Sequence, residues 1–203
     1  MCSNSIKVVL IFFVYLLLGL ASNIHAEFAA NSFSQQLLEA AQKRTTQQVT
    51  YDGSYLAIAY PMGDVPVTQG VCTDLVIRAY RSVEIDLQQL VHEDMQANFS
   101  VYPKIWNLHS TDTNIDHRRV PNLQTFFKRN GRELTVSQEV GDYKPGDLVT
   151  WMLPGNLPHI GIVSNQIAQG SKRPKIIHNI GRGPVEDDIL FKYPVTGHYR
   201  YPK

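Results

Sequence analysis

Residues 70–80 read Gly-Val-Cys-Thr-Asp-Leu-Val-Ile-Arg-Ala-Tyr, a glycine-led start followed by apolar residues at helical spacing. The pattern predicts a helix over residues 72–81, with Cys72 in its first turn. The chain holds two cysteines, and the other, Cys2, lies in the N-terminal segment. If that segment is removed, Cys72 is an unpaired thiol, which is either an inert buried residue or a reactive group.

The first 26 residues have the pattern of an export signal. Lys7 supplies the positive start, residues 8–20 are apolar, and Ala26 ends a small and polar stretch suited to cleavage. The apolar run is short for a transmembrane helix, which needs about 20 residues. We therefore expect an exported protein, periplasmic or secreted, with no membrane span after cleavage. One domain would then cover residues 27–203, with its motif-bearing core in 55–203.

The charge balance excludes a nucleic-acid-binding surface. The chain has 19 Lys and Arg against 18 Asp and Glu, and removal of Lys7 equalises the two. Such a chain lacks the basic excess that phosphate backbones attract. The sequence gives no indication of oligomeric state.

Helical patterns come first along the chain and strand patterns last. The predicted helices cover residues 33–49, 72–81, 86–99 and 121–130, and a short strand or extended piece is expected at 55–60. Further strands are expected at 148–151, 160–163, 175–178 and 195–200, separated by Gly and Pro turns. This order predicts an α+β domain in which helices, including the one that carries Cys72, pack on a C-terminal antiparallel sheet.

Two histidines lie in the predicted strands. His159 begins one strand and His178 ends the next. Antiparallel pairing of these strands would bring both imidazoles to one rim of the sheet. A thiol at a helix N-terminus is acidified by the helix dipole, and a nearby histidine can act as its base.

The ordered motifs resemble those of the NlpC-type cell-wall peptidases, compact members of the papain-like superfamily. The matching segments are Cys72–Tyr80, Pro145-Gly146-Asp147-Leu148-Val149, His159-Ile160-Gly161-Ile162-Val163 and Ile177-His178. A departure is Thr73-Asp74, where these enzymes usually have Ser-Gly. The run from Asn114 to Leu123 and the C-terminal segment 196–201 resemble an exported bacterial family, domain of unknown function 1287.

The resemblance implies a cysteine hydrolase that cleaves an amide bond in peptidoglycan stem peptides. It implies Cys72 as nucleophile, His159 as base and His178 as the residue that orients it, with neighbouring Asn179 as the alternative. It also implies that Tyr60, 12 positions before Cys72, supports the oxyanion with the Cys72 backbone N–H. No metal or organic cofactor is implied. The alternatives are an acyl transferase or esterase on the same site, or a non-catalytic wall-binding module that keeps the fold.

Three groups of residues have open interpretations. The run Asp116-His117-Arg118-Arg119 either binds substrate carboxylates through its arginines or is a loop held by its own Asp–Arg pairs. Asp74 either favours the helix N-terminus or opposes thiolate formation. The cluster His92-Glu93-Asp94 lacks a metal-binding spacing and is expected on a solvated helix face.

Overall fold

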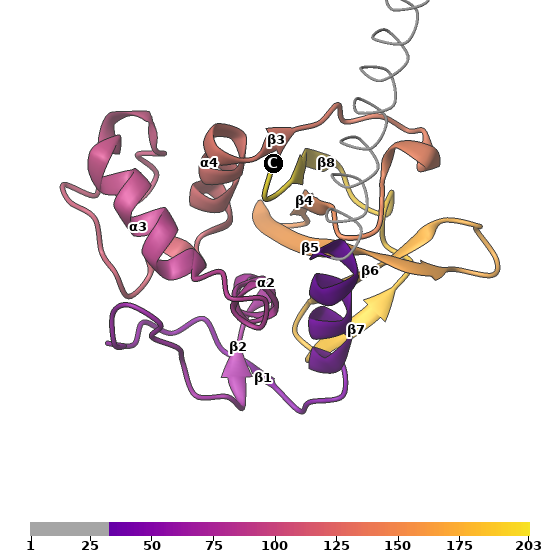
Figure 1. Cartoon of the computed structure of the whole chain (residues 1–203), viewed down its shortest axis with the longest axis horizontal. Coiled ribbons are helices and arrows are strands. Elements are labelled where there is room, and N and C mark those ends of the chain that lie inside the picture. The colour runs from indigo at the N-terminus through magenta and orange to yellow at the C-terminus, as the bar shows by residue number, and fades with distance from the viewer. Residues whose placement is uncertain (1–32) are drawn as a thin grey trace, which may run out of the picture. The chain divides into compact units, whose positions relative to one another are not determined.

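A six-stranded antiparallel sheet dominates the C-terminal part of the computed structural model, which describes residues 33–203 (Figure 1). The strand order is β3-β8-β4-β5-β6-β7. The strands are β3 Arg132–Glu133, β4 Leu148–Leu153, β5 Leu157–Ile167, β6 Pro174–Asn179, β7 Pro184–Asp187 and β8 Val195–Arg200. The structure combines helices with an antiparallel sheet, which confirms the prediction of an α+β domain. The short edge strands β3 and β7 were not predicted.

Three of the predicted helices are confirmed to within a few residues. They are α2 Cys72–Arg81, α3 Leu87–Ala97 and α4 Val120–Asn130. The helix predicted over residues 33–49 ends earlier, at residue 44. A hydrogen-bonded turn follows it, in which both the N–H and the hydroxyl of Thr45 donate to the carbonyl of Gln42. Single 3-10 turns form at η1 Phe99–Val101, η2 Asp116–Arg118 and η3 Val140–Asp142.

Residues 55–60 form no strand, which leaves the extended piece of the two alternatives predicted for them. Side chains, and not a neighbouring strand, satisfy their backbone: Asn114 accepts from Ile58 N–H, and Gln88 donates to Ala59 O, each at 2.8 Å. A two-residue strand forms earlier instead, where β1 Thr50–Tyr51 pairs parallel with β2 Gln69–Gly70. Since β2 leads directly into α2, this pairing brings residues 50–51 to the start of the helix (Figure 1).

The sheet buries both of its faces. On one face lie α2, which packs against β5 and β6, and α4, which packs against β5 and β8. On the other face an apolar cluster is built on alternate strand residues and capped by the segment around residues 189–190. Trp151 is its largest fully buried member, and its indole N–H donates to Leu190 O at 2.9 Å.

Residues 36–203 form one compact unit. The predicted export signal over residues 1–26 lies outside the described residues. Within residues 33–203, every helix is too short or too polar to cross a membrane.

Candidate active site

Cys72 opens α2 directly after the β2 strand. Gly70 makes the turn possible, because its φ is +150° and an added Cβ would lie 3.0 Å from the Asp74 Cβ. The thiol is buried, at 4% exposure. Burial raises the pKa of Cys72 to about 11; the backbone N–H of Ile160 opposes this rise, and the Asp74 carboxylate adds to it. The expected acidification by the helix N-terminus is therefore outweighed by desolvation, and the thiol is neutral in this closed form.

The Cys72 thiol lies at an open end between β5 and β6. The Val163 N–H donates to Asp147 O at 2.8 Å, towards β4. Successive backbone N–H groups of a strand point to opposite sides. Ile160 is three residues before Val163 in β5, so its N–H points the other way, towards β6. The β5–β6 register includes the pair Ile162↔Ile177, and at Ile160 the N–H meets the Cys72 thiol. The sulfur thus takes a position in the ladder that a backbone carbonyl would otherwise fill.

His159 and His178 meet, as antiparallel pairing of their strands predicts. Their rings are 5.2 Å apart and perpendicular, and the His159 ring also lies 5.8 Å from that of its register partner Trp151. Both imidazoles are at most 2% exposed. Burial lowers the pKa of His159 to about 3, helped by repulsion from His178. Burial likewise lowers the pKa of His178 to about 4, against the attraction of Asp187.

Several polar atoms at this end of the sheet have no hydrogen-bond partner among the described residues. They are Nε2 of His159, both ring nitrogens of His178, and Oδ1 of Asn179. Buried polar atoms are nearly always paired in folded proteins, so a group of unpaired ones requires an explanation. A site that binds a polar substrate or water is one such explanation.

Asn179 faces the opposite side of the sheet from His178. Its Nδ2 donates to Gly70 O at 3.3 Å, on the side where α2 packs. Its neighbour His178 shares a face with His159 and Trp151. Strand alternation therefore separates the two candidates for the orienting role, and the ring contact with His159 favours His178.

Asp74 is a structural residue of the helix start. One of its oxygens accepts the Val71 N–H at 2.7 Å, and the carboxylate binds the Arg118 guanidinium at 2.8 and 3.0 Å. The two side chains are 3% and 2% exposed. Both interpretations of Asp74 thus hold, because it caps the helix and also raises the pKa of the thiol.

The run from Asp116 to Arg119 is held mainly by contacts with other parts of the domain, and by one ion pair of its own. Besides Asp74, Arg118 donates to the carbonyl of Ser54, so its guanidinium is already occupied. Arg119 lies 3.6 Å from Asp116 and stacks over Trp106 at 4.2 Å. His117 is buried, which lowers its pKa to about 3. These contacts favour a structural loop over a carboxylate-binding site.

Tyr60 does not lie at the thiol. Its ring makes an edge contact with His92 at 5.1 Å, and the backbone beside it is fixed by the N-cap of α3, where Asp86 accepts the Met62 N–H at 2.7 Å. These contacts do not support its expected oxyanion role, which stays a prediction. The segment lies between two helices, since Gln88 of α3 donates to Ala59 O and Arg81 of α2 donates to Gly63 O.

Tyr51 is the tyrosine at the thiol. Its register partner is Gly70, two residues before Cys72. Burial raises the pKa of Tyr51 to about 12, with further contributions from Cys72 and Asp74 and from a hydrogen bond with the thiol. At 44% exposure the ring both touches the sulfur and reaches solvent. Sequence reasoning missed this residue, since a two-residue strand leaves no periodic signal.

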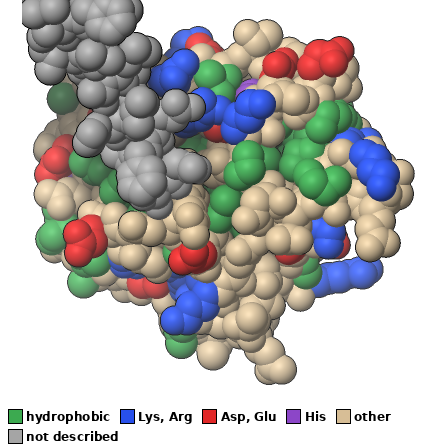
Figure 2. All heavy atoms as spheres, turned by 45° about the vertical axis from the view of Figure 1, so that its right-hand side comes forward, with side chains coloured by type: hydrophobic (Ala, Val, Ile, Leu, Met, Phe, Trp, Pro, Cys, Tyr) green, Lys and Arg blue, Asp and Glu red, His purple; other side chains and the backbone are tan. Residues whose placement is uncertain are grey.

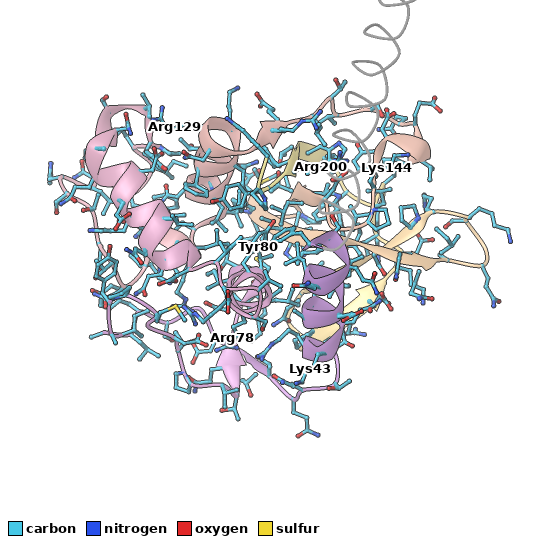
Figure 3. All side chains as sticks on the ribbon, viewed as in Figure 1. Lys43, Arg78, Tyr80, Arg129, Lys144 and Arg200 are labelled. Carbon is cyan, nitrogen blue, oxygen red and sulfur yellow. The ribbon has the colours of Figure 1, made fainter. Side chains whose placement is uncertain are left out.

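The helix that carries Cys72 is held along its length by side chains that include Arg78 and Tyr80, which Figure 3 labels. Arg78 binds Asp64 at 2.8 Å and the carbonyls of Val65 and Pro66, and the Tyr80 hydroxyl donates to Tyr201 O at 2.9 Å. With the Asp74–Arg118 pair, these bonds fix Cys72 relative to the sheet.

No group of three or more His, Cys, Asp or Glu side chains in residues 33–203 is arranged to hold a metal ion. Little histidine is visible on the face in Figure 2, and four of the described histidines, His117, His159, His178 and His198, are buried. That the protein needs no cofactor stays a prediction.

Comparisons with known proteins agree on the family and the fold. Residues 38–201 match the family described as domain of unknown function (DUF1287). An Escherichia coli K12 protein, uncharacterized protein YijF, is 48% identical over 165 residues, which cover 81% of this chain and 80% of that protein. The crystal structure of an N-acetylmuramoyl-L-alanine amidase from Bacteroides uniformis is similar with a TM-score of 0.50 at 13% identity. That match covers 84% of this chain and 99% of the amidase. At this identity the likeness shows the fold alone.

Proposed function

The chain belongs to the DUF1287 family, and from that premise we propose that it is an exported cysteine hydrolase that cleaves an amide bond in peptidoglycan stem peptides. One observation carries the proposal. A buried thiol at a helix N-terminus accepts the N–H of Ile160, the residue after His159, and His159 and His178 both have unpaired ring nitrogens. The amidase fold of the structural neighbour supports an amide substrate from the cell wall. The papain-like arrangement and a periplasmic location are parts of the same proposal.

The proposed reaction uses His159 as a neutral base. The thiol proton passes from Cys72 to His159 Nε2 as the sulfur attacks the amide carbonyl, and a C–S bond forms. The C–N bond then breaks, and the same proton leaves with the amine. Water attacks the thioester, gives a proton back to the sulfur, and releases the carboxylic acid. The ring of His178 holds His159 in position, and the Tyr51 hydroxyl replaces Tyr60 as oxyanion donor beside the Cys72 backbone N–H.

The closed site must change before this reaction proceeds. With a thiol pKa of about 11 and an imidazolium pKa of about 3, moving the proton costs on the order of 11 kcal/mol, before the new charges attract each other. A polar substrate that replaces buried apolar surroundings, and supplies bonds to the unpaired nitrogens, reduces this cost. The thiolate is therefore formed with substrate bound and not in the resting protein.

A second candidate function is favoured by the raised pKa of Cys72. A buried neutral thiol is also what a non-catalytic wall-binding module would contain. An acyl transferase or esterase would use the same residues as the hydrolase, with a different acceptor or leaving group.

Digestion of purified peptidoglycan distinguishes these functions. Wild-type protein and Cys72→Ala are incubated with it, and the fragments are analysed by mass spectrometry. New fragments with wild type alone support the hydrolase and identify the bond. Equal products from both proteins would refute it, and cosedimentation of both with peptidoglycan would then establish the binding module.

A further inference from the structure

A polar groove adjoins the candidate active site. It has a volume of about 430 Å³, and its lining includes Gln47, Gln48, Thr50, Thr68, Arg182 and Pro184. One wall comes from the segment before β1 and the other from the turn between β6 and β7. The walls meet at Gly183, whose φ is +87° and where an added Cβ would lie 3.3 Å from Val49 O.

Both walls of the groove are connected to residues at the start of α2. Thr50 precedes Tyr51, whose hydroxyl interacts with the thiol. Pro184 is the register partner of Asn179, which donates to Gly70 O two residues before the cysteine. A chain lying in the groove is therefore one residue, along the strand or across the register, from groups that contact the segment of Cys72.

The groove offers one cation. Arg182 is the one charged residue among the lining side chains, is exposed, and has no carboxylate within 4.0 Å in the described part of the chain. The other lining residues are uncharged, and they include Gln47, Gln48, Thr50 and Thr68. A guanidinium pairs with a carboxylate through two parallel bonds. A peptide that carries a carboxylate supplies this partner.

We infer that this groove binds the carboxylate-bearing part of the peptide substrate, with Arg182 as the residue that selects for a free carboxylate. The inference rests on the proposed function for its substrate class. Amidation of the carboxylates of the peptide is therefore the modification that tests the inference. It removes their negative charge and leaves the backbone N–H groups in place.

Binding to a protein without the nucleophile tests the groove separately from catalysis. The probes are a synthetic stem tetrapeptide with free carboxylates and the same peptide with all carboxylates amidated. Their dissociation constants are measured by calorimetry for Cys72→Ala and for Cys72→Ala/Arg182→Ala. We expect the free peptide to bind the double variant about tenfold more weakly, as for loss of a hydrogen bond to a charged group. The amidated peptide should bind both proteins equally.

A matched control removes the same charge elsewhere. Arg132 is exposed on β3, at the opposite edge of the sheet from β7, so Cys72→Ala/Arg132→Ala should bind both peptides like Cys72→Ala. An equal loss for both peptides on Arg182→Ala, no loss, or no binding of the free peptide to Cys72→Ala would each overturn the inference. The peptidoglycan digestion reports on catalysis independently, so a failure of either idea is recognised by itself.

Discussion

The pair formed by Asp74 and Arg118 gives the sharpest test of how α2 is held. Asp74→Asn removes one charge of a pair whose side chains are 3% and 2% exposed, and leaves the Arg118 guanidinium buried without its counter-ion. Breaking a buried pair in this way costs about 3–5 kcal/mol. With a urea dependence of about 2 kcal/mol per molar, the unfolding midpoint should fall by about 2 M. The melting temperature should fall by about 10 °C.

The assay is urea unfolding followed by tryptophan fluorescence, with the Arg173–Asp188 pair as the comparison. Those side chains are 29% and 28% exposed at a similar distance of 3.0 Å, so Arg173→Met should cost less than about 1 kcal/mol. A second variant, Asp74→Leu/Arg118→Met, removes both charges and should recover part of the loss. A cost below 1 kcal/mol for Asp74→Asn, or a double variant less stable than the single one, would refute the assigned role of the pair.

Three more outcomes follow from the site. Because the pKa of Cys72 is raised to about 11, iodoacetamide should alkylate it about a hundredfold more slowly at pH 7.5 than it alkylates free cysteine, as read by mass spectrometry; an equal or faster rate would contradict the buried neutral thiol. In initial-rate assays on wall fragments, Tyr51→Phe should lower kcat about a hundredfold through loss of an oxyanion donor, whereas Tyr60→Phe should stay within twofold; the reverse order would restore the original assignment. Burial lowers the pKa of His178 to about 4 in the folded chain, against 6.5 for the exposed side chain. Between these pH values the unfolded chain binds a proton that the folded chain does not. The contribution of His178 to the free energy of unfolding therefore falls by up to about 3 kcal/mol on acidification through this range. His117 and His159, whose pKa values burial lowers to about 3, add to the same fall, so His178→Asn should make that part of the stability profile less steep without removing it. An unchanged profile would count against the burial of the His178 imidazole.

The sequence allowed some parts of this arrangement to be predicted. Helical spacing located α2 with Cys72 at its start, because the buried side of a helix imposes its own periodicity. The meeting of His159 and His178 followed from antiparallel pairing of two consecutive strands, which adjacent strands with a short connection usually adopt. The helix could be predicted from the spacing of its apolar residues, and the meeting of the two histidines from the short connection between their strands.

Other parts depend on contacts between distant segments. The partner of Asp74 is Arg118, 44 positions away, and nothing in either neighbourhood specifies the pair. Tyr51 reaches the thiol through a two-residue strand, which is too short for alternation to be recognised. The pKa of Cys72 was expected to fall because the helix N-terminus is visible in the sequence, whereas the degree of burial that reverses the shift is a property of the whole fold.

The three anchors of α2 and the two-residue strand beside its start are held by different numbers of contacts. The helix that carries Cys72 is tied to the rest of the domain by Arg78, by Asp74 and by Tyr80. Tyr51, the proposed oxyanion donor, lies at the thiol on a strand of two residues. Few hydrogen bonds must break to open such a strand, whereas α2 opens only with its anchors. In hydrogen exchange, the amides of residues 49–52 should therefore exchange faster than those inside α2.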